Sequence, residues 1–173
     1  GQIVVLESSP YHKLSDLAGK QVAFANPDGF TGYWVPMDKL LQNHVQVEAL
    51  FAGNQESAMT KLAIGNVAAA GVNDRVMAQY ARREGLKYRV LWSSEPYMDL
   101  VIMAHPRVPA ETVTKVRHTL LEMVHDAEGK KVLQNVSEKM KSDQLLSFVA
   151  ANSSDYDNYR IFYRNTQLNK SSP

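Results

Sequence analysis

Short apolar runs alternate with longer amphipathic stretches along the first part of the chain. Apolar runs bounded by Gly, Pro or polar clusters are typical of strands, and apolar positions three and four apart are typical of helices. The expected strands are residues 3–7, 21–25, 45–51, 68–72, 88–92 and 100–104. The expected helices are residues 14–19, 33–43, 55–64 and 74–84. This alternation favours an α/β fold whose parallel strands are joined by crossover helices.

Asparagine and glycine mark the ends of the expected helices. Asn54 is placed to cap the helix that follows it, and Gly65 and Gly85 are placed to end the helices before them. After Pro106 the apolar positions keep a helical spacing, which predicts helices at residues 109–126, 128–135 and 142–151. The polar tail at residues 165–173 is expected to fray.

The composition is that of an ordinary globular protein, with 45% of the 173 residues apolar and 21% charged. Lys and Arg number 19 against 18 Asp and Glu, and the resulting net charge of +1 argues against nucleic-acid binding. The sequence has no cysteine, so disulfides and thiolate metal sites are excluded. No apolar run is long enough to predict a transmembrane helix.

The sequence lacks the common signatures of a metal centre or an enzyme. Its five histidines form no His-x-x-x-His or His-Glu-x-x-His pattern. The serine pairs Ser8-Ser9 and Ser93-Ser94 lack the surroundings of a nucleophile elbow, and there is no phosphate-binding loop of NTPases. We therefore expect no catalytic residues, no metal site and no cofactor, and a protein that is not an enzyme.

A glycine-rich loop follows the strand expected at residues 21–25. It reads Asp28-Gly29-Phe30-Thr31-Gly32-Tyr33 and opens the next expected helix. Backbone N–H groups and the positive end of a helix dipole would then point to one spot, as they do where small anions bind. The alternative is an ordinary strand-to-helix turn in which Thr31 caps the helix and no ligand binds.

Five segments of the chain resemble, in the same order, the phosphate/phosphonate-type periplasmic binding proteins, which are the substrate receptors of ABC importers. The segments read DLAGKQVAF, GYWVP, LAIGNVAAAGV, RVLWSSEP and DAEGKKVL. The resemblance implies a type 2 periplasmic-binding-protein fold, an α/β architecture of mixed, mostly parallel sheets flanked by helices in two lobes. Residues 10–98 would form the second lobe. Residues 1–9 and 99–173 would supply the hinge strand and the C-terminal part of a first lobe that lacks its N-terminal part.

The resemblance also implies a ligand site between the lobes. The implied ligand-binding residues are Thr31, Gly32, Tyr33, Gln55, Asn73, Asp74, Tyr97 and Asp99. Relatives often offer a side chain to the ligand at the position of Gln55. Relatives also carry an aspartate at the position of Asp99, which accepts hydrogen bonds from a protonated anion or an amine. Tyr97 would add an amphipathic wall.

Several of these residues also have purely structural interpretations. The segment around Gln55 could serve only to cap a helix through Asn54, and Asp74 could itself be a helix cap. Asp99 could cap the hinge without touching a ligand. These alternatives stay open at the level of the sequence.

The loop departs from the family at two positions. Where relatives commonly read Ser-Thr-Ser-Gly-Tyr, this chain reads Gly29-Phe30-Thr31-Gly32-Tyr33, so two of three hydroxyl donors are missing. Because a hydrogen bond to a charged group contributes about 1.5–3 kcal/mol, we expect inorganic phosphate to bind weakly or not at all. Replacing both Gly29 and Phe30 by serine is expected to strengthen oxyanion binding.

Two hypotheses of function follow. In the first, the protein is an extracytoplasmic receptor that delivers a small oxyanion or phosphonate-like ligand, anionic or zwitterionic, to the permease of an ABC importer. In the second, the same fold is a ligand-sensing or regulatory extracytoplasmic domain with an altered ligand site and a signalling partner. Both place the protein in the periplasm or elsewhere outside the cytoplasm. An incomplete lobe would leave apolar surface uncovered, which predicts a homodimer through that lobe or a companion fragment.

Overall fold

The computed structural model of the protein describes residues 1–170, which fall into two compact units. The first unit holds residues 1–96 together with the chain from residue 159 onward, and the second holds residues 97–158. The boundary after residue 96 is close to the one expected after residue 98, but the first unit also includes the N-terminal strand and the C-terminal segment. The assignment of residues outside 10–98 to a first lobe stays a prediction.

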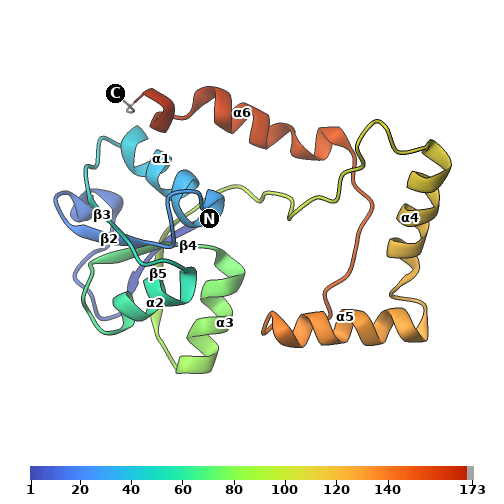
Figure 1. The fold of residues 1–173 in the computed structure, drawn as a ribbon. Coiled ribbons are helices and arrows are strands. Elements are labelled where there is room, and N and C mark those ends of the chain that lie inside the picture. The colour runs from blue at the N-terminus through green and yellow to red at the C-terminus, as the bar shows by residue number, and fades with distance from the viewer. Residues whose placement is uncertain (171–173) are drawn as a thin grey trace. The chain divides into compact units, whose positions relative to one another are not determined.

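The first unit is built on a five-stranded sheet in the order β3-β2-β4-β1-β5 (Figure 1). Its strands are β1 (Gln2–Leu6), β2 (Gln21–Phe24), β3 (Glu48–Phe51), β4 (Ala69–Val72) and β5 (Tyr88–Ser93). β2 pairs in parallel with β3 and β4, whereas β1 is antiparallel to β4 and to β5. β1 therefore runs against the other strands. The expected parallel pairing is correct around β2 and wrong for β1, which separates β4 from β5.

The described helical elements of the first unit lie between these strands and at its C-terminal end. They are η1 (Leu14–Leu17), η2 (Phe30–Trp34), α1 (Val35–Gln42), α2 (Gln55–Ala63), α3 (Asp74–Glu84) and η4 (Leu168–Lys170). η2 is one π-helical turn that leads directly into α1. α6 (Asp157–Asn165) begins in the last residues of the second unit and continues into the first.

Both faces of the three central strands, β2, β4 and β1, are buried, which accounts for their short and mostly apolar sequences. One face packs against α2 and α3 through a cluster that includes Val4, Met59 and Met77. The other face packs against α1 through a cluster that includes Ile3 and Leu40. The neighbours Ile3 and Val4 point to opposite faces, as successive residues of a strand do. Each fully buried aliphatic side chain stabilises the fold by about 1.5–3 kcal/mol.

A glycine in β4 makes room for the largest side chain of β2. A Cβ built on Gly71 would lie 2.5 Å from Cδ1 of Phe24, far closer than van der Waals contact allows. The Phe24 ring is fully buried and occupies the place that a side chain at position 71 would need. Any other residue at position 71 would therefore displace the ring from the core.

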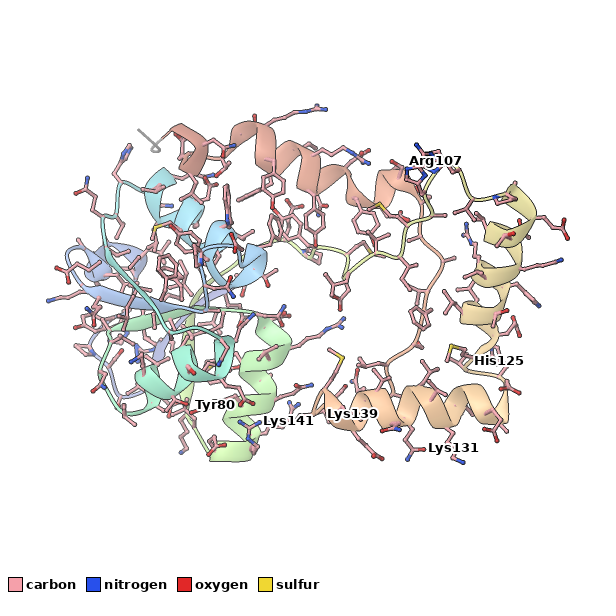
Figure 2. The ribbon with its side chains drawn as sticks, in the orientation of Figure 1. Tyr80, Arg107, His125, Lys131, Lys139 and Lys141 are labelled. Carbon is pink, nitrogen blue, oxygen red and sulfur yellow. The ribbon has the colours of Figure 1, made fainter. Side chains whose placement is uncertain are left out.

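The helix ends in the first unit agree with the sequence-based expectations. The side chain of Asn54 accepts the N–H of Ser57 over 2.8 Å and caps α2. Gly65 and Gly85 follow α2 and α3 with φ of +75° and +64°, a conformation that glycine adopts without strain. Tyr80 of α3, labelled in Figure 2, ties this helix to α2, because its hydroxyl lies 3.1 Å from that of Thr60.

The second unit contains α4 (Ala110–Glu122), α5 (Ala127–Lys139) and η3 (Ser153–Tyr156). α4 and α5 correspond to the helices expected at residues 109–126 and 128–135. His125, labelled in Figure 2, lies in the turn between them. The side chain of Asp126 caps α5 by accepting the N–H of Gly129 over 2.7 Å.

Two elements expected in the second unit are wrong. Residues 100–104 form no strand, and residues 142–151 form no helix. Apolar residues at 100–104 suggested a strand, but this segment pairs with no described strand. The side chains of Leu100 and Met103 are 96% and 81% exposed. The backbone N–H of Leu146 donates to Oγ of Ser137 in α5 over 2.8 Å, so a tertiary hydrogen bond replaces a helical one.

Within residues 1–170, no helix combines the length and the apolar character that crossing a membrane requires.

Candidate functional site

Helices begin at the edge of the sheet where β2, β3 and β4 end. η2 and α1 follow β2, α2 follows β3, and α3 follows β4. Because these strands are parallel, their carboxyl ends meet at one edge, which is where open α/β sheets bind ligands. The amino ends of the helices bring partly positive N–H groups to the same edge. This edge therefore favours a negatively charged ligand.

Thr31, Gln55 and Asn73 come together at this edge from three different loops. Nδ2 of Asn73 donates a hydrogen bond to Oγ1 of Thr31 over 3.3 Å. The backbone N–H of Asn73 donates to Oε1 of Gln55 over 2.7 Å. We call these three residues the polar cluster. All three were expected from the sequence to bind a ligand, and the structure brings them together, although their part in binding stays a prediction.

The hydrogen bonds inside the polar cluster decide which atoms remain as donors. The Thr31 hydroxyl accepts from Asn73 and therefore keeps its own proton to donate. Gln55 accepts through Oε1, which assigns the other end of its amide, Nε2, as a donor. A Cβ built on the buried Gly32 would lie 3.4 Å from that Nε2, so a side chain at position 32 would press on the Gln55 amide. Gly32 was also expected to bind the ligand, which stays a prediction, and its lack of a side chain leaves room for the Gln55 amide.

The turn that carries Thr31 is shaped by the carbonyl of Gly29. The N–H groups of Tyr33 and Trp34 both donate to this oxygen, over 2.8 and 3.0 Å. These bonds begin the helix, so the N–H groups of Thr31 and Gly32 come before the first N–H group that has an acceptor within the helix, as in any helix amino end. The capping position is that of Gly29, and the alternative in which Thr31 caps the helix is wrong.

Tyr33 packs against other aromatic side chains, and its expected part in ligand binding stays a prediction. Its ring makes edge contacts with Phe24, at 5.1 Å between centroids, and with Phe51, at 4.9 Å. Burial raises the pKa of the Tyr33 hydroxyl above its ordinary value of 10.0, so the group is neutral at physiological pH. The aromatic trio of Phe24, Tyr33 and Phe51 lines the same edge of the sheet as the polar cluster.

Asp74 is exposed and is the first residue of α3, but it does not cap the helix. The cap is Asn73, whose Oδ1 accepts the N–H groups of Arg75 and Val76 over 3.1 and 3.2 Å. The capping interpretation of Asp74 is therefore wrong. A carboxylate one residue away from the polar cluster repels an anion there, unless the ligand also carries a positive charge.

Tyr97 and Asp99, the two remaining expected site residues, belong to the second unit. Within that unit, the Tyr156 hydroxyl donates to the backbone oxygen of Asp99 over 3.1 Å. Oδ1 of Asp99 accepts the N–H of Leu100 over 2.8 Å. Their meeting with the polar cluster across a cleft stays a prediction.

Aromatic residues of α6 hold Phe30, a role that the sequence analysis missed. The Phe30 ring stacks on Tyr159 at 4.5 Å between centroids and makes an edge contact with Phe162 at 5.1 Å. Tyr163 contacts both Phe30 and Trp34. The spacing of positions 159, 162 and 163 is helical and could have predicted α6 and its apolar face.

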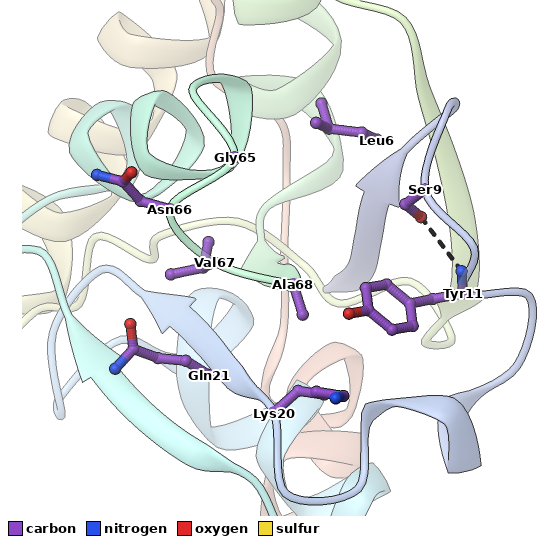
Figure 3. A pocket seen from close by; sticks show the side chains of 9 residues that line it. All are labelled: Leu6, Ser9, Tyr11, Lys20, Gln21, Gly65, Asn66, Val67 and Ala68. Atoms are coloured by element: carbon purple, nitrogen blue, oxygen red, sulfur yellow. Dashed lines mark hydrogen bonds between the residues drawn. The ribbon is translucent and has the colours of Figure 1, made fainter.

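A separate cavity of about 350 Å³ lies at the opposite edge of the sheet, where β2 and β4 begin (Figure 3). Its lining residues are Leu6, Ser9, Tyr11, Lys20, Gln21, Gly65, Asn66, Val67 and Ala68. In Figure 3 the side chains of Tyr11 and Lys20 extend toward one another across it, and Oγ of Ser9 accepts the N–H of Tyr11 over 3.4 Å. Ligands of open α/β sheets bind at the carboxyl ends of strands, so this cavity is not the candidate site.

The described residues hold no group of three or more His, Cys, Asp or Glu side chains able to bind a metal ion. The polar cluster itself is made of a hydroxyl and two amides. These groups suit the recognition of an oxyanion by hydrogen bonding, and none is a nucleophile paired with a base.

Comparison with known proteins identifies relatives of this chain. The sequence model of the family described as the periplasmic substrate-binding protein of the phosphonate ABC transporter matches residues 1–156. No curated protein is similar enough to this sequence to count as a match.

Several solved structures share the fold. A Xanthomonas citri protein bound to a chloride ion is 16% identical with a TM-score of 0.74, and the match covers 94% of this chain and 63% of that one. The PhnD1 protein of Prochlorococcus marinus in complex with methylphosphonate is 18% identical with a TM-score of 0.69, covering 98% and 66%. A binding protein component of an ABC phosphonate transporter from Pseudomonas aeruginosa is 19% identical with a TM-score of 0.64, covering 94% and 55%. The chain thus spans between 55% and 66% of the length of these relatives.

Proposed function

The chain belongs to the family of periplasmic substrate-binding proteins of phosphonate ABC transporters, and from this premise we propose that its polar cluster binds a small phosphonate-type oxyanion. Members of this family are substrate receptors and not enzymes, and the family works outside the cytoplasm. The ligand would be held by the Thr31 hydroxyl, the Gln55 amide and the N–H groups of the η2 turn. The receptor would then deliver it to the permease of an ABC importer.

The convergence of Thr31, Gln55 and Asn73 is the observation that carries this proposal. Residues 18 and 42 positions apart in sequence meet within hydrogen-bond distance where several helices begin, and each remaining donor is oriented by an internal hydrogen bond. Donors that are held in place before the ligand arrives lose little freedom on binding. The sensory alternative gains no support from the comparisons.

Calorimetric titration with methylphosphonate, together with thermal-shift assays, tests the proposal. Binding to the native state alone raises the apparent stability, so the melting temperature should rise with methylphosphonate concentration. Thr31→Val removes the hydroxyl and keeps the shape, and it should weaken binding about tenfold or more, since one charge-assisted hydrogen bond is worth about 1.5–3 kcal/mol. The matched control is Thr31→Ser, which keeps the hydroxyl and should bind nearly as well as the parent.

Asn73→Asp provides a second, independent variant. Its Oδ atoms can still accept the N–H groups of Arg75 and Val76, so α3 stays capped. The added negative charge at the polar cluster should abolish the binding of an anion. Equal methylphosphonate affinity in the parent, Thr31→Val and Asn73→Asp would exclude the polar cluster as the binding site.

Self-association through the second unit belongs to the same proposal. Ile102, Met140 and Val149 of that unit are 63%, 63% and 69% exposed, in keeping with a surface that a second copy or another chain would cover. Sedimentation analysis over a range of protein concentrations tests whether the protein forms a homodimer. A monomer at all concentrations would exclude the homodimer.

A further inference from the structure

Phe30 occupies a position next to Thr31 in the η2 turn, but its ring does not belong to the polar cluster. It lies among the rings of Tyr159, Phe162 and Tyr163, with centroids 4.5, 5.1 and 5.7 Å away. Successive residues of a helical turn point in different directions, so one face of the turn meets α6 while the next residue meets Asn73. The turn is therefore held on both sides.

The far end of the same turn is held by the same helix. The Trp34 ring lies 5.6 Å from that of Tyr163 between centroids. Its indole N–H also donates to the carbonyl of Pro27 over 2.8 Å. Aromatic contacts at both Phe30 and Trp34 thus bracket the residues that carry the proposed binding groups.

A buried carboxylate anchors the chain that follows α6. Asp38 of α1 is only 4% exposed, and its Oδ1 accepts the hydroxyl of Thr166 over 2.7 Å and the N–H of Gln167 over 2.6 Å. Its Oδ2 accepts Nε2 of Gln42 over 2.6 Å. Thr166 is itself 2% exposed. Burying a carboxylate without hydrogen-bond donors costs much free energy, so these hydrogen bonds strongly favour the packing of the C-terminal segment against α1.

We propose that residues 159–168 form a brace for the oxyanion site, with Phe30 as the positioning residue through which the brace sets the direction of Thr31. This proposal rests on the function proposed above. It also accounts for the aromatic residue in a loop where relatives commonly place a hydroxyl, since Phe30 holds the C-terminal segment and contributes nothing directly to the ligand. A binding group must be held to about 0.5 Å to be effective, and a one-turn π-helix depends on its neighbours for that precision.

Tyr159 offers the sharpest test, because it is remote in sequence from every residue of the polar cluster. Tyr159→Ala removes the stacking partner of Phe30, and Tyr159→Phe keeps the ring as a matched control. Leu86→Ala is a second control, since Leu86 packs against the hydrophobic core between α2, α3 and the opposite face of the sheet. It should lower the melting temperature without touching η2.

Two readouts are measured on each variant. The first is hydrogen exchange, in the ligand-free protein, of the Tyr33 and Trp34 amides, which bond to the carbonyl of Gly29. The second is calorimetric affinity for methylphosphonate. Tyr159→Ala should speed the exchange and weaken the affinity about tenfold, which corresponds to about 1.4 kcal/mol. Tyr159→Phe should restore both, and Leu86→Ala should leave both near the parent values.

Unchanged exchange at Tyr33 and Trp34 in Tyr159→Ala would overturn the brace. Faster exchange with unchanged methylphosphonate affinity would also overturn it, because the turn would then be held without serving the site. If the parent itself does not bind methylphosphonate, the proposed function fails, and the exchange measurement alone still decides whether α6 holds the turn. Phe30→Leu, which keeps an apolar side chain, repeats the exchange test if Tyr159→Ala does not fold.

Discussion

The side-chain amide of Asn73 donates to the Thr31 hydroxyl over 3.3 Å, which joins the ends of β4 and β2 across 42 positions of sequence. The same side chain caps α3 through its Oδ1, so one residue both ends a strand and orients a proposed binding group. A substitution at this position therefore affects stability and binding through different atoms. These two effects can be separated by choosing the replacement.

Asn73→Ala should lower the free energy of unfolding by about 1 kcal/mol, because it removes the acceptor of two helix-end N–H groups. Asn73→Asp should stay within a few tenths of a kcal/mol of the parent, since aspartate caps helices as well as asparagine does. Urea denaturation of the three proteins measures the difference. Equal losses in the two variants would mean that the cap contributes nothing.

Inorganic phosphate should bind weakly or not at all. Gly29 and Phe30 supply no hydroxyl, and each absent charge-assisted hydrogen bond removes about 1.5–3 kcal/mol of binding free energy. The nearby Asp74 carboxylate further disfavours a dianion. Calorimetry at fixed ionic strength checks this, and Asp74→Asn is the matched variant that should bind phosphate more tightly. Sub-micromolar binding by the parent would show that backbone N–H groups suffice for the site.

Gly29→Ser should strengthen methylphosphonate binding by itself. Gly29 has a φ of −71°, which any residue adopts, and a Cβ there would meet Asn26 atoms no closer than 3.4 Å. Serine also suits this capping position. The added hydroxyl should improve affinity up to about tenfold, less than the full value of a charge-assisted hydrogen bond.

Adding Phe30→Ser to Gly29→Ser should reverse this gain. The sequence alone led us to expect that the double change strengthens binding, but the structure shows that the Phe30 ring stacks on Tyr159. Removing the ring frees the turn, and the second hydroxyl would be poorly placed. Titration of both variants with methylphosphonate distinguishes the two views, since tighter binding by the double variant would favour the expectation from the sequence.

Asp16 should make the stability depend on pH at the acidic end. Hydrogen bonds from the backbone N–H of His12 foremost, and also from that of Lys13, lower the pKa of Asp16 below its ordinary value of 3.8. The stabilisation from this carboxylate is present above the ordinary pKa and is lost as the pH falls through the lowered one. Urea midpoints should therefore separate the parent from Asp16→Asn near neutral pH and converge as the pH falls below the ordinary pKa of 3.8 and through the lowered one. A constant separation at all pH values would contradict the assignment.

Local sequence signals were sufficient where an element carries its own ends. α3 spans Asp74–Glu84 and ends before Gly85, as the sequence predicted, although its cap is Asn73 and not Asp74. The positions of β2 and β4 follow from short apolar runs that only a covered sheet can bury. The loop at Gly29, the polar residues after β4 and the segment after Asn54 were all recognised as parts of a candidate site.

The sequence alone could not determine which partners these elements find. β1 has the same apolar pattern whether it runs with or against its neighbours, so only the assembled sheet decides that it is antiparallel. The apolar spacing of residues 142–151 predicts a helix, but the hydrogen bond from Leu146 to Ser137 is a contact between distant positions.

Phe30 shows most clearly which properties follow from the sequence and which depend on tertiary contacts. In the sequence, Phe30 stands where relatives commonly have a hydroxyl donor, in a loop expected to bind an anion. The residues beside it in the chain give no indication of its contact with Tyr159. Chemical type and spacing determined that this chain would build an α/β sheet, and they predicted an oxyanion site at the ends of its strands. Tertiary structure decided which of the site residues meet, because hydrogen bonds and ring contacts depend on distances that only the folded chain sets.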